Sequence, residues 1–215
     1  KALGAKSRKA LAAGTLTGAA VFDTSVWSKQ LDEDIRPVIA GIIGDSLVLA
    51  AKEFGKGIDV ESPEVQDYID LQMQRLDKAN ASTKSEVDDA IKTAIAFNGG
   101  DDDKNLLLKA SLAAIFLHLQ RTRRRNIAEH EAQSAYNAGT YFGGSNAGAD
   151  GQYVKTWVSR RDERVRTAHR MLDGQHVKAD AHFRVQGIDI RFPGDPVAPL
   201  NQTMGCRCRL SWRKK

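Results

Sequence analysis

The 215-residue sequence lacks several features that would assign it to a well-defined class. It has only two cysteines, separated by a single residue, and these do not make a disulfide framework. A bridge between them would be strained, so the cysteine content indicates a reducing cytosol. The chain begins at Lys1 without an initiator methionine, and we expect it to be a fragment or a processed product.

Long hydrophobic runs and aromatic residues are also scarce. No segment has the composition of a signal peptide, and the most apolar one, residues 38–51, is too short for a membrane span and contains Asp45. We therefore predict a soluble protein. Aromatic residues make up 7% of the sequence and are not interleaved with basic ones, which argues against a surface that stacks single-stranded bases.

Charge is distributed unevenly, although the formal net charge is only +5. Residues 1–110 hold 14 Lys and Arg against 18 Asp and Glu, whereas residues 111–215 hold 18 against 9. The basic residues of the second part are mostly arginines, which suit phosphate recognition better than lysines. Two interpretations stay open: a polyanionic partner for this part, or an ordinary solvated basic face.

The first half of the chain has the periodicity of helices. Residues 2–20 have few large apolar side chains, and we expect them to form a loose arm. A helix with one apolar stripe is predicted from Pro37 to Phe54, ended by the glycines at 55 and 57. Another begins at residues 62–64, where Ser is a good N-cap and Pro fits the first helical position.

Further helices are predicted from residue 82 or 85 to residue 97, over residues 105–119, and over residues 123–138. Glu131 lies on the apolar stripe of the last one. A buried carboxylate is costly unless it is paired, so we expect an arginine or several backbone N–H groups to meet it, unless it reaches water at the edge of the stripe. Residues 139–152 are rich in glycine, lack the ending of a phosphate-binding loop, and are predicted to be a flexible connection.

The pattern changes after Tyr153. Short strands are predicted at residues 153–158, 182–185, 189–192 and 206–213, with a helix over residues 162–174. We therefore predict an α+β fold class: a mainly helical N-terminal half, followed by a small α+β module with a short antiparallel sheet.

Four polar residues line up beside the apolar face of the helix predicted at 162–174: Asp162, Arg166, His169 and Asp173. They can form a structural network, with Glu131 as a further member, or half of an active site in which His169 is the acid or base. No nucleophile motif accompanies them, which favours the structural network. His118 and His130 carry no functional prediction; we expect the first in the core and the second facing solvent.

Residues two apart in the predicted closing strand share a face. Its inner face would hold Cys206, Cys208, Leu210 and Trp212, and its outer face Arg207, Arg209, Ser211 and Arg213. In one interpretation the cysteines are small hydrophobic residues. In the other, their thiolates bind zinc together with two of three histidines: His169, His176 and His182. The spacing is not that of a standard zinc knuckle, which favours the first.

The second half carries an ordered set of motifs. Its centre is W-x4-D-x3-R-x2-H-x4-G over residues 157–174, followed by Phe183, the PGDP turn at 193–196 and CRC at 206–208; R-x-IA-x-x-E-x3-AYNAG precedes it at 125–139. Over roughly residues 121–212 the chain resembles the phage Mu F / SPP1 gp7 family of minor head (head morphogenesis) proteins of tailed bacteriophages. The family usually has Thr-Glu where this chain has His130-Glu131.

The resemblance implies a virion protein inside the capsid near the portal, made in the host cytoplasm, that acts in head morphogenesis and in DNA packaging or ejection. Its expected partners are the portal protein, capsid or scaffold proteins, and double-stranded DNA without sequence preference. Residues 1–120 would dock on the portal or capsid, and residues 121–215 would form the conserved module. The candidate DNA contacts are Arg121, Arg123, Arg124, Arg125, Arg160, Arg161, Arg164, Arg207 and Arg209.

An alternative stays open, because modules of this family also occur fused to toxin or protease domains. The chain could be a metal-dependent enzyme or a toxin-like module, a nuclease or a transferase, built on the same C-terminal domain. The sequence contains no known catalytic motif, so we predict a protein without enzymatic activity and without a cofactor, zinc excepted as the alternative above.

Overall fold

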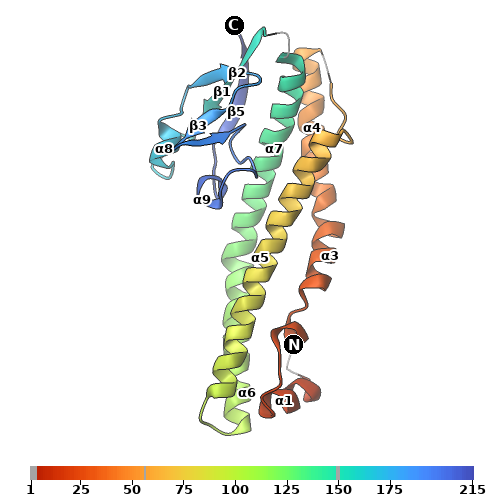
Figure 1. The fold of residues 1–215 in the computed structure, drawn as a ribbon, viewed down its shortest axis with the longest axis vertical. Coiled ribbons are helices and arrows are strands. Elements are labelled where there is room, and N and C mark those ends of the chain that lie inside the picture. The colour runs from red at the N-terminus through yellow and green to blue at the C-terminus, as the bar shows by residue number, and fades with distance from the viewer. Residues whose placement is uncertain (1–3, 56, 149–150) are drawn as a thin grey trace. The chain divides into compact units, whose positions relative to one another are not determined.

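The computed structural model describes residues 4–55, 57–148 and 151–215 (Figure 1). Within these residues seven α-helices come first, with a π-helical turn before the last: α1 Ala5–Ala12, α2 Gly18–Val21, α3 Thr24–Asp34, α4 Arg36–Phe54, α5 Pro63–Ala96, α6 Asp101–His118, η1 Leu119–Arg123 and α7 Arg124–Gly148. Short elements follow: β1 Tyr153–Val158, α8 Thr167–Arg170, β2 His176–Lys178, β3 Phe183–Val185, β4 Ile188–Ile190, α9 Leu200–Thr203 and β5 Arg209–Lys214. The predicted α+β class is confirmed. No helix of the described chain is both long and apolar enough to cross a membrane.

The chain divides into two compact units that alternate along the sequence. The first unit contains Lys1–Glu33 and Gln74–Arg125, and the second contains Asp34–Met73 and Asn126–Lys215. Helices α5 and α7 therefore contribute residues to both units. The regions predicted from the sequence, 1–120 and 121–215, are contiguous instead, and their separate roles in docking and DNA contact stay a prediction.

The first unit has an apolar core to which the N-terminal segment belongs. Its buried members are Leu11, Leu16, Phe22, Val87, Ile91, Ala94, Leu108 and Leu112. The loose arm expected over residues 2–20 is therefore wrong for its described part. The separate helix expected from residue 82 or 85 is also wrong, because α5 runs unbroken to Ala96. Residues 77–86 contain neither glycine nor proline, so nothing in them ends the helix.

Helix α4 of the second unit has the predicted apolar stripe, with Ile39, Ile43 and Leu47 buried. It ends as predicted at Gly55, whose φ of 70° lies in the left-handed region. Helix α5 begins at Pro63, as the Ser-Pro-Glu signal predicts.

The flexible glycine-rich connection predicted after residue 138 is wrong for residues 139–148, because α7 continues through them to Gly148. The glycines serve close packing. A Cβ on Gly139 would lie 2.5 Å from the Cβ of Ser46, and one on Gly143 would overlap Ala50 of α4. A Cβ on Gly144 would overlap the Trp212 ring. Two residues of the predicted connection, 149 and 150, lie outside the described part.

The sheet of the second unit has β1 in the middle, with β2 and β5 antiparallel on its two sides. A separate antiparallel hairpin is made of β3 and β4. Strand β1 has the predicted bounds, whereas β5 begins at Arg209, three residues later than expected, and β2 was not predicted. In the register of β1 and β5, Lys155 lies opposite Trp212, and Trp157 opposite Leu210. Trp212 donates from Nε1 to the carbonyl of Thr140 in α7, 2.9 Å away, which joins the sheet to the helix.

The helix predicted over residues 162–174 is wrong. Only α8, Thr167–Arg170, is helical there, and Gly174 ends the turn that follows it with a φ of 78°. The carboxylate of Asp162 accepts from the backbone N–H of Arg164 at 3.1 Å. Such a local side-chain bond competes with the helical ladder, and the left-handed φ of 60° at Arg161 also turns the chain.

Candidate nucleic-acid interface and metal centre

The polar residues predicted along one helix face make separate contacts in the structure. Asp162 accepts from Arg207 at 2.6 Å, which lowers the pKa of its carboxyl group. Asp173 accepts from the backbone N–H of Ser159 and from Arg161, each at 2.8 Å, and both contacts lower its pKa. These two ion pairs tie the turn after β1 to its neighbours.

The other two members bind backbone and amide groups. Arg166 donates to the carbonyl of Met204, and Nε2 of His169 lies 3.2 Å from Oε1 of Gln202. Glu131 is buried in α7, as its place on the apolar stripe predicts. Its Oε1 lies 3.9 Å from Nε2 of His130. A single network of all five predicted residues is not described, and their structural role stays a prediction.

The expectations for the two other histidines are wrong. His130 was expected to face solvent, but it is only 2% exposed because it lies on the inner side of α7. His118 was expected in the core, but it is exposed at the last residue of α6.

A hollow of about 600 Å³ lies where the end of β1, α7 and the start of β5 meet in the second unit. Its walls are Gln133, Tyr136, Val158, Ser159, Arg160, Arg161, Arg207 and Arg209. The pairing of Val158 with Arg209 in the sheet brings the two arginine-bearing segments together. Four of the nine arginines proposed from the sequence thus line one concave surface.

The arginines of this hollow differ in their charge balance. Arg161 is paired with Asp173, and Arg207 with Asp162. Arg160 and Arg209 are exposed and make no ion pair within the described part of the chain. The hollow therefore presents positive charge that the second unit does not neutralise, next to the exposed ring of Tyr136.

The remaining arginines of the prediction lie elsewhere. Arg164 is exposed in the turn before α8 but does not line the hollow. Arg121 and Arg125 are exposed at η1 and at the start of α7, in the first unit. The side chains of Arg123 and Arg124 lie outside the described residues. Among the described residues of this second group, Arg121, Arg125 and Arg164 do not line the hollow.

Asn137 of α7, which the sequence reasoning missed, holds the module to the helix. Its side chain is fully buried. It donates to the carbonyls of Pro193 at 2.8 Å and Cys208 at 3.0 Å, and it accepts from the N–H of Leu210 at 3.0 Å. The available signal was the asparagine of the AYNAG motif, a polar residue between two core alanines.

The PGDP turn is fixed by a second residue that sequence reasoning did not single out. Arg191 donates to both carboxylate oxygens of Asp195, at 2.8 and 2.7 Å, and Asp195 is 1% exposed. The Oγ of Ser134 donates to the carbonyl of Gly194 at 2.6 Å, which attaches the same turn to α7. These bonds fix the position of the turn from which the chain continues to Cys206 and Cys208.

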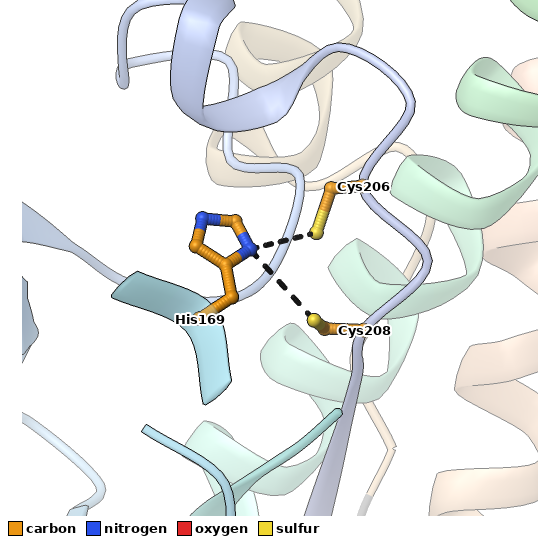
Figure 2. A group of neighbouring side chains, drawn as sticks. All are labelled: His169, Cys206 and Cys208. Atoms are coloured by element: carbon orange, nitrogen blue, oxygen red, sulfur yellow. Dashed lines mark hydrogen bonds between the residues drawn. The ribbon is translucent and has the colours of Figure 1, made fainter. Parts of the chain in front are cut away.

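Two cysteines and one histidine meet in the interior of the second unit (Figure 2). Nδ1 of His169 lies 3.5 Å from Sγ of Cys206 and 3.8 Å from Sγ of Cys208. All three residues are buried, and Figure 2 shows the ring nitrogen directed at both sulfurs. The other two predicted ligands, His176 and His182, are exposed and do not join the cluster.

The pKa values of the two thiols are shifted in opposite directions. A hydrogen bond from Cys208 and the nearby arginines 166 and 207 lower the pKa of Cys206. Donation of that same bond and burial raise the pKa of Cys208. One sulfur is therefore the readier thiolate, in a place from which solvent is excluded.

The fold and its sites define an α+β module attached to long helices, with a basic hollow on its surface and a Cys–His cluster inside. A family described as phage Mu protein F like protein matches residues 85–211, which is more than half of the chain. The chain belongs to this phage Mu F-like family, and the resemblance inferred from the sequence is confirmed. No curated protein and no solved structure gives a match.

Proposed function

We propose that the chain is a minor head protein of a tailed bacteriophage, that it lies inside the virion near the portal, and that its arginine-lined hollow contacts the phosphates of packaged duplex DNA. Membership of the phage Mu F-like family supports the head-protein assignment. The observation that carries the DNA contact is the convergence of Arg160, Arg161, Arg207 and Arg209 on one hollow.

The proposed contact is electrostatic. Guanidinium groups bind phosphate oxygens in fork geometry, and such contacts position a protein on duplex DNA without reading its sequence. Arg160 and Arg209 are the main candidates, because no carboxylate in the described residues offsets them. Arg161 and Arg207 would act as oriented supports held by Asp173 and Asp162.

The protein partners follow from the same family membership and from charge. Residues 1–110 carry more acidic than basic residues, in contrast to the rest of the chain. In this proposal they face the portal or another capsid protein rather than DNA, while the basic part faces the genome. The role is structural, in head morphogenesis and in packaging or ejection of DNA, and the protein is not an enzyme.

Duplex binding across a salt series tests the DNA interface. Affinity falls as salt rises, and the plot of log affinity against log salt has a negative slope. Removal of one arginine that binds a phosphate should make this slope shallower by about 0.9. The double variant Arg160→Ala/Arg209→Ala should therefore make the slope shallower by about 2 and weaken binding equally for unrelated DNA sequences. Lys52→Ala/Lys109→Ala is the matched control, because it removes the same charge from exposed residues of α4 and α6.

Equal slopes for the two double variants would contradict the hollow as the surface that binds DNA. If both double variants bind DNA as the unchanged protein does, with the same salt slope, the arginines of the hollow are an ordinary solvated face. Cleavage of the duplex during the titration would instead favour the nuclease alternative.

A further inference from the structure

The geometry of the Cys–His cluster points to a zinc-binding site formed by His169, Cys206 and Cys208, which clamps the C-terminal segment to α8. This site goes beyond the proposed function, which uses only the surface arginines. Three features support the site: the spacing of the ligand atoms, the groups behind His169, and the short elements that the site joins.

The spacing of the ligand atoms is that of a tetrahedral zinc site. Zinc binds thiolate sulfur at about 2.3 Å and imidazole nitrogen at about 2.0–2.1 Å, which places neighbouring sulfur and nitrogen ligands about 3.6 Å apart. The two distances from Nδ1 of His169 are 3.5 and 3.8 Å, and all ligand atoms lie within 4.8 Å of one another. An ion therefore fits between them with little movement of the backbone.

The groups behind His169 select the tautomer that a metal needs. The amide nitrogen of Gln202 donates to Oε1 of Gln186 at 2.8 Å, so its carbonyl oxygen faces Nε2 of His169, 3.2 Å away. Nε2 therefore carries the proton, and the lone pair of Nδ1 points at the sulfurs. Metal-binding histidines usually donate from their other ring nitrogen in this way.

The backbone of Gln186 is held in an unfavourable conformation at this point. It has a φ of 50°, in a region that glycine or asparagine would occupy more readily, and Gly187 follows with a φ of 85°. Gln202, to which it is bonded, is 5% exposed. The tight turn between β3 and β4 thus places the Gln186 side chain where its Oε1 accepts from the Gln202 amide behind the histidine.

The surroundings of the cluster suit a structural ion. The ring of Trp157 packs edge-on against His169, with 5.2 Å between ring centroids, and shields it from water. The chain between β1 and β5 contains only short elements, none longer than four residues. Small modules of this kind often need a metal or a disulfide to supplement their core.

The ligand set selects zinc over the hard cations. Thiolates and imidazole are soft or borderline ligands, whereas magnesium and calcium prefer oxygen. No further Cys, His, Asp or Glu of the described residues joins the group. Three protein ligands occupy three of the four tetrahedral positions of zinc.

Metal analysis of the whole chain tests the site. The chain is purified under reducing conditions without chelator, reconstituted with zinc, desalted and measured by plasma mass spectrometry. We expect one zinc per chain. Cobalt loading should give the visible bands of tetrahedral cobalt with thiolate ligands, a result that needs no variant and reports the ligands directly.

Two variants and a control identify the residues. Cys208→Ser and His169→Gln should each lower the bound zinc at least tenfold, because each removes one of three ligands. His182→Gln is the matched control, since it removes an exposed histidine outside the cluster, and it should keep the full zinc content. Far-ultraviolet circular dichroism of each variant, taken alongside, shows that the chain is folded.

Three results would overturn the site: reconstituted chain without stoichiometric zinc, cobalt spectra without thiolate bands, or full zinc retention in folded Cys208→Ser. A mass lower by two hydrogens, with no reactive thiols, would replace the metal by a bridge between the cysteines. Zinc binding and DNA binding are measured separately, so failure of either proposal leaves the other standing.

Discussion

The two units of the molecule differ in how far along the chain their buried polar side chains find hydrogen-bond partners. In the first unit the described buried polar residues are Thr83 and Asn105, and each bonds to the carbonyl four residues earlier in its own helix. In the second unit, Ser46 and Thr203 bond in the same local way, but the buried Asn137, Ser134 and Gln202 also bond to groups between 16 and 73 residues away.

The difference follows from the elements that each unit contains. Long helices satisfy their own backbone groups, so the first unit relies mainly on apolar contact, with a long-range bond from the N–H of Gly18 to Oδ1 of Asp88 at 2.8 Å. The module of the second unit contains strands of three to six residues and long irregular connections. Its buried carbonyls and N–H groups must find side-chain partners, because leaving one unpaired costs about 1–3 kcal/mol.

The largest effect should come from Asn137→Leu, which keeps the branched shape of the side chain but removes all three long-range bonds of the asparagine. The carbonyls of Pro193 and Cys208 and the N–H of Leu210 are then left without this partner. We expect a decrease of about 4 kcal/mol or more in the free energy of unfolding, measured by urea denaturation with tryptophan fluorescence.

Asn146→Leu in the same helix serves as the control. It removes a single bond from an exposed residue to the carbonyl of Gly57 and should cost less than about 1 kcal/mol. Equal costs for the two variants would show that the second unit does not depend on its directional contacts.

A smaller effect is expected from Leu108→Ala in the first unit. Leu108 is fully buried in the apolar core, and truncation of such a residue costs about 2–5 kcal/mol through the transfer energy of the deleted atoms and the cavity that remains. Leu106→Ala, at a residue that is 68% exposed in the same helix, should change stability by less than about 0.5 kcal/mol. Urea denaturation of both variants measures the difference, and a small cost at Leu108 would mean that this core is not what holds the helices.

The smallest effect concerns Lys155, a buried cation in the second unit. Its Nζ has no hydrogen-bond partner in the described structure and lies 4.7 Å from the centre of the Tyr141 ring. Burial lowers the pKa of Lys155 from 10.5 to about 8, although Asp195 and Asp180 oppose this shift. Between these two pH values the unfolded chain holds a proton that the folded chain releases, so this lysine adds stability as the pH rises.

Lys155→Met should therefore stabilise the chain by about 1–3 kcal/mol at pH 7, and the gain should shrink as the pH rises from 8 to 10. Thermal unfolding of the two proteins at several pH values measures this difference, in which the other titrating groups largely cancel. A gain that is constant with pH would contradict the lowered pKa of Lys155, and a decrease in stability at pH 7 would show that the cation-π contact outweighs the cost of burial.

The parts of the fold that follow from local pattern were predictable. The stripe of α4, the start of α5 at Pro63 and the bounds of β1 each depend on residues close together in the sequence. The errors have a common cause. Ser82 and Gly143 carry turn propensity, but packing overrides it within α5 and α7, and the bond between Asp162 and Arg164 stops a helix that periodicity favoured.

The candidate sites were predictable only as sets of residues. The arginines and the cysteines were recognised, but nothing local indicates that Arg160 and Arg209 meet at one hollow or that His169, rather than His176 or His182, joins the cysteines. Gln186 and Gln202 gave no chemical signal of their own, and Asn137 gave only its place in the AYNAG motif. Their roles arise from contacts that close long loops.

By itself the sequence determined the α+β class, the succession of a helical half and a half with short strands, the uneven charge and the membership of the phage Mu F-like family, because these depend on composition, periodicity and motif spacing. Tertiary structure alone decided which of these residues meet. The hollow exists because strand pairing brings α7, β1 and β5 together, and the Cys–His cluster because the chain before β5, held by Asn137, meets α8; such long-range contacts leave no local pattern in the chain.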